Sequence, residues 1–353
     1  MGISQLVLGV PGVLGGDSIA PTCVLTSDAV EPVVAAFTLT VTFSEGVTGF
    51  ALGDITVGHG AASNFTAVSA AVYTATITAT ASDPEDVTIV VNAGVCTDPA
   101  GNPNTASNTL TLQRLYSYLA TLGFTIDARF NETSGDLLNY GSDGDAAVSG
   151  ATQAQAGQLG AGEAYLFDGA DDVCTFANAD VANTKALTTR RGLALINATS
   201  LGELDAGRLF DWNSHFTSLN FVSTNRLQCI IDTDGTDANA ISNNNQVDFV
   251  GAWALVFWDY DDADALGLGR KIRLMRATAA SATTLLTLGT DTAATGTVIA
   301  PSGNLTLGNN DALVVSFDGL FDVFAQGGSL WSPAATPADV TIPDRIRQLV
   351  FGV

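Results

Sequence analysis

Hydrophobic and small polar residues alternate along three segments in the first third of the chain. The segments are 37–43 (FTLTVTF), 73–78 (YTATIT) and 87–91 (VTIVV). A period of two places every second side chain on the same face of a β-strand, so each segment predicts a strand with one buried and one solvated face. Clusters of turn-forming residues separate the segments at the spacing typical of a small sandwich. We therefore predict an all-β domain over residues 20–113.

Short strand-like runs and glycine turns also dominate residues 124–353. The runs lie at 165–167, 251–257, 303–308 and 317–323. The turns between the earliest of them contain glycines, which adopt backbone angles that other residues resist, at positions 141, 144, 160, 162 and 169. This pattern predicts a second and larger β-sandwich over residues 124–353.

Two short segments fall outside the predicted sandwiches. Residues 114–123 (RLYSYLATLG) form the one stretch with helical character, and we expect them to join the two domains. Residues 1–19 are apolar and glycine-rich, with no alternation long enough for a strand. We expect them to form a docking arm that packs on its own domain or on a neighbour in an assembly.

Several motifs within residues 20–113 follow one another in a characteristic order: 41–50 (VTFSEGVTGF), 54–57 (DITV), Tyr73 with Thr74, and 97–104 (TDPAGNPN). In this order they resemble the bacterial immunoglobulin-like repeat of large surface adhesins. The resemblance implies an immunoglobulin-like sandwich that acts as a spacer or docking module. Some members of that family hold calcium between neighbouring repeats, and Asp98 and Asn102 lie in the matching turn, although a single copy offers no adjacent repeat.

A second resemblance covers about two hundred residues of the larger domain. An acidic loop, a glycine-rich turn and the strand YLFDGADD at 165–172 come first, followed by the runs at 251–257, 303–308 and 317–323. This order looks like the laminin-G-like or concanavalin-A-like jelly roll of lectins and surface proteins. The fold class that we predict is therefore all-β, with a small immunoglobulin-like sandwich and a larger concanavalin-A-like jelly-roll sandwich.

The jelly-roll resemblance also implies a structural calcium ion under the acidic loop. The side chains that match the expected ligands are hard oxygen donors, which suit Ca²⁺ better than Zn²⁺ or Mg²⁺: Asn139, Ser142, Asp143 and Asp145, with Asp171 and Asp322 from other strands. The alternative is that these side chains only cap turns, because Asp and Asn do so without any ion.

Composition excludes some classes of partner. Only 14% of the 353 residues are charged, the formal net charge is −23, and the first basic residue is Arg114. Nucleic acids and anionic membrane surfaces are bound through clustered Lys and Arg, so we expect neither partner. No apolar run reaches the 18 residues of a membrane span, and we expect no membrane insertion. The four cysteines form no metal-binding spacing, which favours buried thiols over disulfides.

The residues that could support catalysis are few. The acidic run 259–264 (DYDDAD) is the one candidate for a pair of hydrolytic carboxylates, but it has the composition of a hairpin turn. The two histidines, His59 and His215, fall in different domains, and His215 lacks the glycines of a nucleophile elbow. We therefore expect no enzymatic activity and no cofactor other than structural calcium.

Two surface features are candidates for binding. Sugars stack on exposed aromatic rings, and Trp212 and Trp331 lie near predicted loops, whereas we expect Trp253 to belong to the core. The run 270–276 (RKIRLMR) concentrates basic residues in an acidic protein, and it is either a solvated strand face or an assembly patch that meets an acidic neighbour, formed by Arg270, Lys271, Arg273 and Arg276.

An adhesin-type spacer joined to a lectin-like domain predicts contact with an external surface. The chain begins without a recognisable export signal, so the leading hypothesis is a structural protein of a bacteriophage particle, as capsid decoration or as part of a tail or fibre. Its partners would be other virion proteins, copies of itself and host glycans. The alternative is a secreted or cell-surface carbohydrate-binding adhesin, and a weaker one is a glycoside hydrolase.

Overall fold

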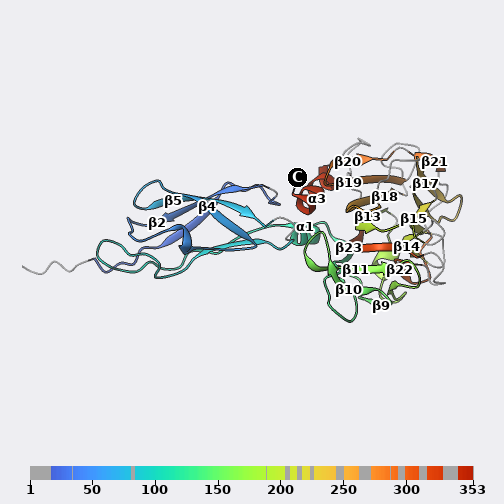
Figure 1. Ribbon diagram of the computed structural model, residues 1–353, viewed down its shortest axis with the longest axis horizontal. Helices are drawn as coiled ribbons and strands as arrows, with labels where there is room; N and C mark the ends of the chain where they lie inside the picture. The colour runs from blue at the N-terminus through green and yellow to red at the C-terminus, as the bar shows by residue number, and fades with distance from the viewer. Residues whose placement is uncertain are drawn as a thin grey trace, which may run out of the picture. The chain divides into compact units, whose positions relative to one another are not determined.

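The computed structural model divides the chain into two compact units (Figure 1). Among the described residues, unit 1 consists of 17–30, 35–79 and 87–112, and unit 2 contains those within 113–352 together with the short segments 31–33, 80 and 84–86. The structure describes residues 17–33, 35–80, 84–187, 189–202, 207–212, 217–222, 226–243, 250–261, 272–286, 288–292, 299–309, 316–328 and 341–352. Both units are built mainly from β-strands, which confirms the predicted all-β class.

Unit 1 contains two antiparallel sheets. The four-stranded sheet runs in the order β1 (Cys23–Ser27), β2 (Phe37–Phe43), β5 (Val72–Ala79), β4 (Gly60–Ala67), and the three-stranded sheet in the order β3 (Ile55–Gly58), β6 (Val87–Val91), β7 (Leu110–Leu112). The predicted alternation is present, because alternate residues of β2, β5 and β6 are buried. A short 3-10 helix, η1 (Leu52–Asp54), precedes β3.

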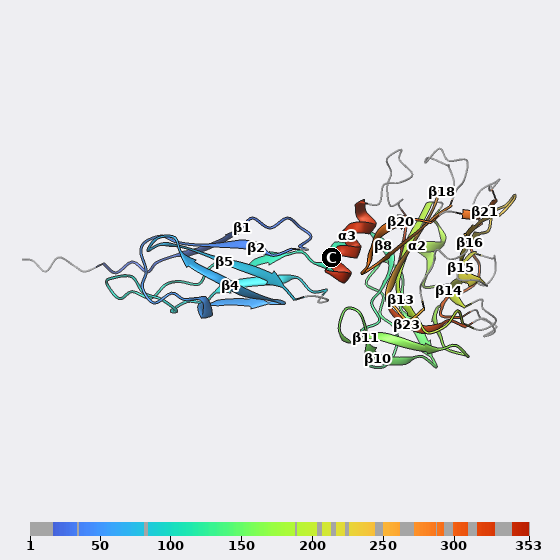
Figure 2. The same cartoon turned by 45° about the horizontal axis from the view of Figure 1, so that its top comes forward.

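Unit 2 contains two larger sheets, which we name the back sheet and the front sheet. The back sheet has the order β10 (Thr152–Ala156), β11 (Ala161–Asp168), β23 (Asp318–Gly327), β13 (Thr189–Ala198), β18 (Ala254–Asp261), β19 (Ile272–Thr278), β20 (Ser281–Leu285), and β8 (Phe124–Ala128) also pairs with β23. The front sheet has the order β21 (Leu288–Thr292), β17 (Ala238–Ser242), β16 (Arg226–Ile231), β15 (Thr217–Val222), β14 (Arg208–Trp212), β22 (Leu305–Leu307), β12 (Val173–Phe176), β9 (Ala146–Ser149). Figure 2 shows them as two layers.

The main core of unit 2 lies between these two sheets. Alternate residues of the central strands meet there, as expected for a sandwich whose inner faces interdigitate. Trp258 is almost fully buried and packs against Phe210 and Phe324, with ring centroids 5.1 and 5.7 Å apart. The indole also lies directly over Gly192 on the neighbouring strand, where a Cβ atom would stand 2.0 Å from Cζ2 of Trp258.

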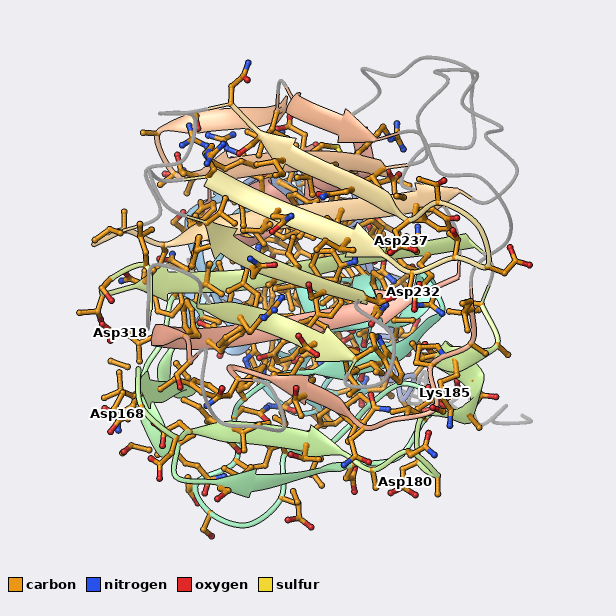
Figure 3. The ribbon with its side chains drawn as sticks, turned by 90° about the vertical axis from the view of Figure 1, so that its right-hand side faces the viewer. Asp168, Asp180, Lys185, Asp232, Asp237 and Asp318 are labelled. Carbon is orange, nitrogen blue, oxygen red and sulfur yellow. The ribbon has the colours of Figure 1, made fainter. Side chains whose placement is uncertain are left out.

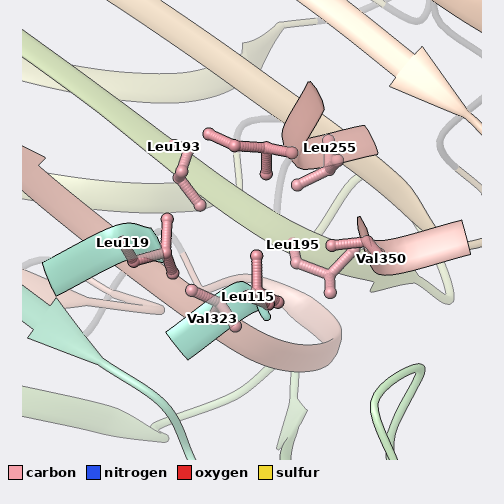
Figure 4. A pocket seen from close by; sticks show the side chains of 8 residues that line it. Leu115, Leu119, Leu193, Leu195, Leu255, Val323 and Val350 are labelled. Atoms are coloured by element: carbon pink, nitrogen blue, oxygen red, sulfur yellow. The ribbon is translucent and has the colours of Figure 1, made fainter. Parts of the chain in front are cut away.

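A second core lies on the other face of the back sheet, under two helices. Helices α1 (Leu115–Thr121) and α3 (Thr341–Phe351) cover apolar residues of β13, β18, β19 and β23. Figure 4 shows the centre of this layer, where Leu115 and Leu119 of α1 approach Leu195 and Val323. Residues 114–123, predicted to be a joint, therefore form part of unit 2. None of the described helices is long and apolar enough to cross a membrane.

Arg114, the first basic residue of the chain, ties separate segments of unit 2 together. Its guanidinium is buried and donates hydrogen bonds to the carbonyl oxygens of Val33 at 2.8 Å and Thr80 at 3.2 Å. Its backbone N–H donates to Asp86 Oδ1 at 2.8 Å. Backbone carbonyls thus replace water around a buried cation, which is the condition under which a charge tolerates burial. Helix α2 (Ala182–Lys185) is the remaining described helix.

Candidate functional site

The predicted calcium loop is held by hydrogen bonds from the protein itself. Asn139 Oδ1 accepts from the backbone N–H groups of Asp127 at 2.7 Å and Gly141 at 3.0 Å. Asp145 Oδ1 accepts from the N–H of Asn139 at 2.8 Å. Asp143 accepts from the N–H groups of Asn183 and Thr184, both at 2.9 Å, and Asn183 Nδ2 also donates to the carbonyl oxygen of Ser142. These side chains act as turn caps in the structure, and calcium at this loop stays a prediction.

The other two predicted calcium ligands, Asp322 and Asp171, lie on different parts of unit 2. Asp322 of β23 is fully buried, and its Oδ2 accepts a hydrogen bond from the N–H of Leu159 at 3.0 Å. Asp171 lies in the turn after β11, where carboxylate oxygens of Asp168, Asp171 and Asp172 lie within 4.8 Å of one another. Figure 3 shows Asp168 beside Asp318, its register partner on β23. Burial, with Asp168 and Asp171 nearby, raises the pKa of Asp172.

A second acidic cluster lies in unit 1 and contains the predicted turn residue Asp98. Ligand atoms of Asp17, Glu45 and Asp98 lie within 4.8 Å of one another. Burial acts to raise the pKa of Asp98, but hydrogen bonds from the side chain and backbone of Asn102 and from two further backbone groups outweigh it and lower the pKa. Asn102 Nδ2 donates to Asp98 Oδ2 at 2.7 Å and to the carbonyl oxygen of Asp17 at 3.0 Å. Calcium at either acidic cluster stays a prediction.

The acidic and basic runs of the second domain contribute to one buried ladder. Arg191 of β13, Asp259 of β18 and Arg273 of β19 are cross-strand neighbours in register. Arg273 Nε donates to Asp259 Oδ1 at 2.9 Å, and a second bond joins its Nη2 to Oδ2. The side chains of Arg273 and Asp259 are 1% and 0% exposed. Burial lowers the pKa of Arg191, and the nearby Tyr118 and Asp259 act against that shift.

This ladder corrects one predicted surface residue. Arg273 was expected in an assembly patch, but a guanidinium buried against Asp259 offers no surface to a neighbouring molecule. Arg276 is partly exposed, and Arg270 and Lys271 lie outside the described residues. Asp259, the first carboxylate of the hydrolytic candidate run, is equally inaccessible to a substrate. Residues 262–264 and His215 also lie outside the described residues.

The burial of Trp212 and Trp253 differs from the prediction. Trp212 of β14 is 0% exposed and forms part of the core between the sheets, so it cannot stack on a sugar. It lies on the same strand as Leu209 and Phe210, which are also buried. The burial of this strand therefore includes Trp212, although Trp212 is its last residue. Trp331 lies outside the described residues. Trp253, predicted to be core, is only partly buried and lies just before β18.

Trp253 lines an open cavity of about 430 Å³ at the edge of the helical layer of unit 2. The walls come from four parts of the fold and include Gln158, Trp253, Arg276, Thr278, Ser281 and Phe351. This volume lies within the range of about 300–1,000 Å³ that is typical of small-ligand sites. In the sequence, the small residues Gly251 and Ala252 come just before Trp253, and Ala252 also lines the cavity.

The four cysteines are free and buried: Cys23, Cys96, Cys174 and Cys229. Burial raises the pKa of the Cys23 and Cys96 thiols to about 11 and that of Cys229 to about 12. A raised pKa keeps each thiol protonated and therefore weakly nucleophilic and weakly metal-binding at neutral pH. None of these cysteines belongs to a cluster of three ionisable ligands within the described part of the chain.

Comparison with known proteins finds one family that is similar to the N-terminal part of the chain. Residues 17–113 match the family described as the bacterial Ig-like domain, in agreement with the predicted resemblance. The match covers unit 1 and leaves unit 2 unassigned. No curated protein matches the chain.

Solved structures resemble the fold only distantly. Domain 4 of AbnA, an extracellular arabinanase of family GH43 from Geobacillus stearothermophilus in complex with arabinotriose, is 13% identical, with 64% of this chain and 98% of that chain covered and a TM-score of 0.37. The binding domain of botulinum neurotoxin serotype D is 7% identical, with 60% and 49% covered and a TM-score of 0.40. Domains LG4-5 of the mouse laminin α1 chain are 11% identical, with 88% and 80% covered and a TM-score of 0.35. These likenesses carry no functional argument.

Proposed function

We propose that this chain is a non-enzymatic binding protein of adhesin type, in which unit 1 is a spacer and unit 2 binds a saccharide. The observation that carries the proposal is the open cavity beside Trp253, on a β-sandwich that follows a bacterial Ig-like domain in the same chain. A partly buried aromatic ring inside a concave, mixed polar and apolar site is the arrangement that stacks on a sugar. The spacer would carry this site away from the surface that bears the protein.

A non-enzymatic role is supported by the environment of the candidate carboxylate. Glycoside hydrolysis needs two carboxyl groups that reach the scissile bond from opposite sides, about 5–10 Å apart. Asp259 is buried and paired with Arg273, so it cannot serve as one of them. Incubating the purified chain with bacterial polysaccharides and measuring released reducing sugar tests this point. Release above that of a heat-inactivated sample would refute the non-enzymatic role.

The finer proposal is that the protein is a structural component of a bacteriophage particle and presents unit 2 outward toward host glycans. A bacterial Ig-like domain also suits a secreted or cell-surface adhesin, which is the alternative. Mass spectrometry of purified particles and of host envelope fractions distinguishes them. Recovery from particles is expected, and recovery only from the envelope would leave the adhesin alternative.

Saccharide binding itself is tested with the whole chain on an array of bacterial glycans. We expect retention on a subset that shares one sugar residue. Signals that match those of isolated unit 1, or no signal on any glycan, would contradict the proposed binding function. The array also supplies the ligand class for the experiments below.

A further inference from the structure

The cavity beside Trp253 combines one apolar wall with one polar wall. Trp253 and Phe351, the last residue of α3, are both partly buried. Both pack against the second core, which holds their rings in position. The polar wall is formed by Gln158 and by the β19–β20 turn, which contains Thr278 and Ser281. A sugar ring has the same two-sided character, with an apolar C–H face and a rim of hydroxyl groups.

The polar wall can both donate and accept hydrogen bonds. Gln158 Nε2 donates to the carbonyl oxygen of Val350 at 3.4 Å, and no described residue donates to its Oε1. The hydroxyl groups of Thr278 and Ser281 lie 2.9 Å apart and share one hydrogen bond, which leaves further capacity on each oxygen. Hydroxyl groups of a ligand need such mixed partners, because each hydroxyl both donates and accepts.

Among the described residues that line the cavity, Arg276 is the only charged one. Its Nε is buried and has no hydrogen-bond partner among the described residues. Because that Nε is shielded from solvent, only the more exposed part of Arg276, which is partly exposed as a residue, can meet a ligand oxygen. The cavity therefore combines a stacking surface with a cationic side chain in its wall.

The turn that forms the polar wall is fastened to helix α3. Arg347 Nε donates to the carbonyl oxygen of Thr278 at 2.8 Å, and its Nη2 donates to that of Ala279 at 3.0 Å. The N–H of Thr283 donates to Asp344 Oδ1 at 3.2 Å, which adds a second link between β20 and the same helix. A wall held from two sides does not have to be ordered when the ligand binds, and this preorganisation favours affinity.

We propose that this cavity is a subsite for one neutral sugar residue, whose ring stacks on Trp253 and whose hydroxyl groups bond to Arg276, Gln158 and the Thr278–Ser281 turn. The inference rests on the proposed saccharide-binding function and assigns its site. A neutral ligand is favoured over an acidic one because the chain carries a formal net charge of −23, which repels polyanions at long range.

The test measures binding of neutral oligosaccharides to the full chain by isothermal titration calorimetry. The probes are oligosaccharides of glucose, galactose, mannose, xylose, arabinose and N-acetylglucosamine. We expect one sugar type to bind, Trp253→Ala and Arg276→Gln each to weaken its Kd by about tenfold or more, and Trp253→Phe to weaken it less, because Phe keeps a stacking surface. A binding-dependent change in tryptophan fluorescence that is lost in Trp253→Phe gives a second signal, since Trp212 and Trp258 are buried in the core.

Two controls separate a local effect from a folding defect. Arg345→Gln removes a cation from the same helix, α3, without touching the cavity, and Tyr140→Ala removes an aromatic ring that is 48% exposed elsewhere on unit 2. Both should bind like the wild type. Melting curves of every variant are recorded, and Ser281→Ala offers a mild change that removes only one hydroxyl oxygen.

The possible results distinguish a wrong subsite from a wrong proposal that the chain binds saccharides. If the chain binds an oligosaccharide and the Trp253 and Arg276 variants bind it equally well, the subsite is wrong and the proposed function stands. If no saccharide binds the chain, the proposed function fails as well. If the neutral probes do not bind and the chain is retained on the glycan array only by acidic glycans, with retention that falls steeply between 0.05 and 0.5 M salt, the neutral ligand is wrong, because screening weakens charge pairs.

Discussion

Removing Arg273 tests whether the ladder across the back sheet is truly buried. In Arg273→Met the apolar stem is kept, and Asp259 loses both hydrogen bonds that the guanidinium donates. The side chains of the pair are 1% and 0% exposed, so water cannot replace the lost bonds without opening the structure. Removing one partner of a buried ion pair destabilises a protein by about 3–5 kcal/mol, and the neighbouring Arg191 offsets part of that loss here. Because whole domains have stabilities of about 5–15 kcal/mol, the loss should be large.

The assay is urea unfolding followed by tryptophan fluorescence. Trp212 and Trp258 are buried in unit 2, and unit 1 has no tryptophan, so the signal reports on unit 2. Arg345→Met is the matched control, since it makes the same change at a partly exposed site on α3, and we expect it to change the unfolding free energy by less than about 0.5 kcal/mol. The double variant Asp259→Leu with Arg273→Met should lose less than the single variant, because neither charge of this pair then remains buried and only the weaker interaction of Asp259 with Arg191 is lost in addition.

A small effect would refute the reasoning. If Arg273→Met destabilised unit 2 by less than about 1 kcal/mol, the pair would behave like a solvent-exposed salt bridge. Arg273 would then have to reach the surface, and the prediction that it contributes to an assembly patch would regain its basis. A double variant as unstable as the single one would show that packing, not charge burial, causes the loss.

Three further predictions concern other parts of the molecule. Gly192→Ala should destabilise unit 2 by about 1–3 kcal/mol and change its near-UV circular dichroism, because the new Cβ would lie 2.0 Å from Trp258; an unchanged spectrum and stability would contradict this packing. The four thiols should react with Ellman's reagent at pH 8 only after unfolding, because burial raises their pKa values; reaction of the native protein would show an accessible cysteine. The pKa of Asp98 lies below its ordinary value of 3.8, so its carboxylate stabilises unit 1 above that pH and the contribution is lost as the pH falls through the lowered pKa. Asp98→Asn should therefore be less stable than the wild type at pH 6, with the difference shrinking toward pH 2; a constant difference would exclude this linkage.

Alternation predicted several of the strands because it is a local property of the sequence. Strands β2 and β6 have the predicted bounds, since every second residue of each is apolar and the turns around them are polar or small. Helix α3 was missed although Ile346, Leu349 and Val350 have helical spacing. Its segment is short and follows a stretch rich in Pro, Ala and Thr, and it was included in the predicted jelly roll without an element of its own.

The candidate site could not be predicted in the same way, because it depends on cross-strand partners. Arg273 and Asp259 are fourteen residues apart, and only the antiparallel pairing of β18 with β19 places them side by side. A basic run therefore looked like a surface patch. The predictions for Trp212 and Trp253 failed for a related reason. Trp212 was expected to be exposed and Trp253 to be buried, but proximity to a loop does not reveal which face of a strand the ring occupies. Burial depends on the register with neighbouring strands.

The acidic composition of unit 1 has a structural explanation that bears on its proposed role as a spacer. With no Lys or Arg before Arg114, its carboxylates bond to backbone N–H groups: Asp28 to that of Thr38 at 2.6 Å, Asp54 to that of Ala51 at 2.8 Å and Asp98 to that of Asn102 at 2.8 Å. Such bonds fasten turns without a cationic partner. The negative charge left on the surface discourages copies of the unit from associating with one another. A module that stays folded and does not adhere to its own kind suits a spacer, and it leaves recognition to unit 2.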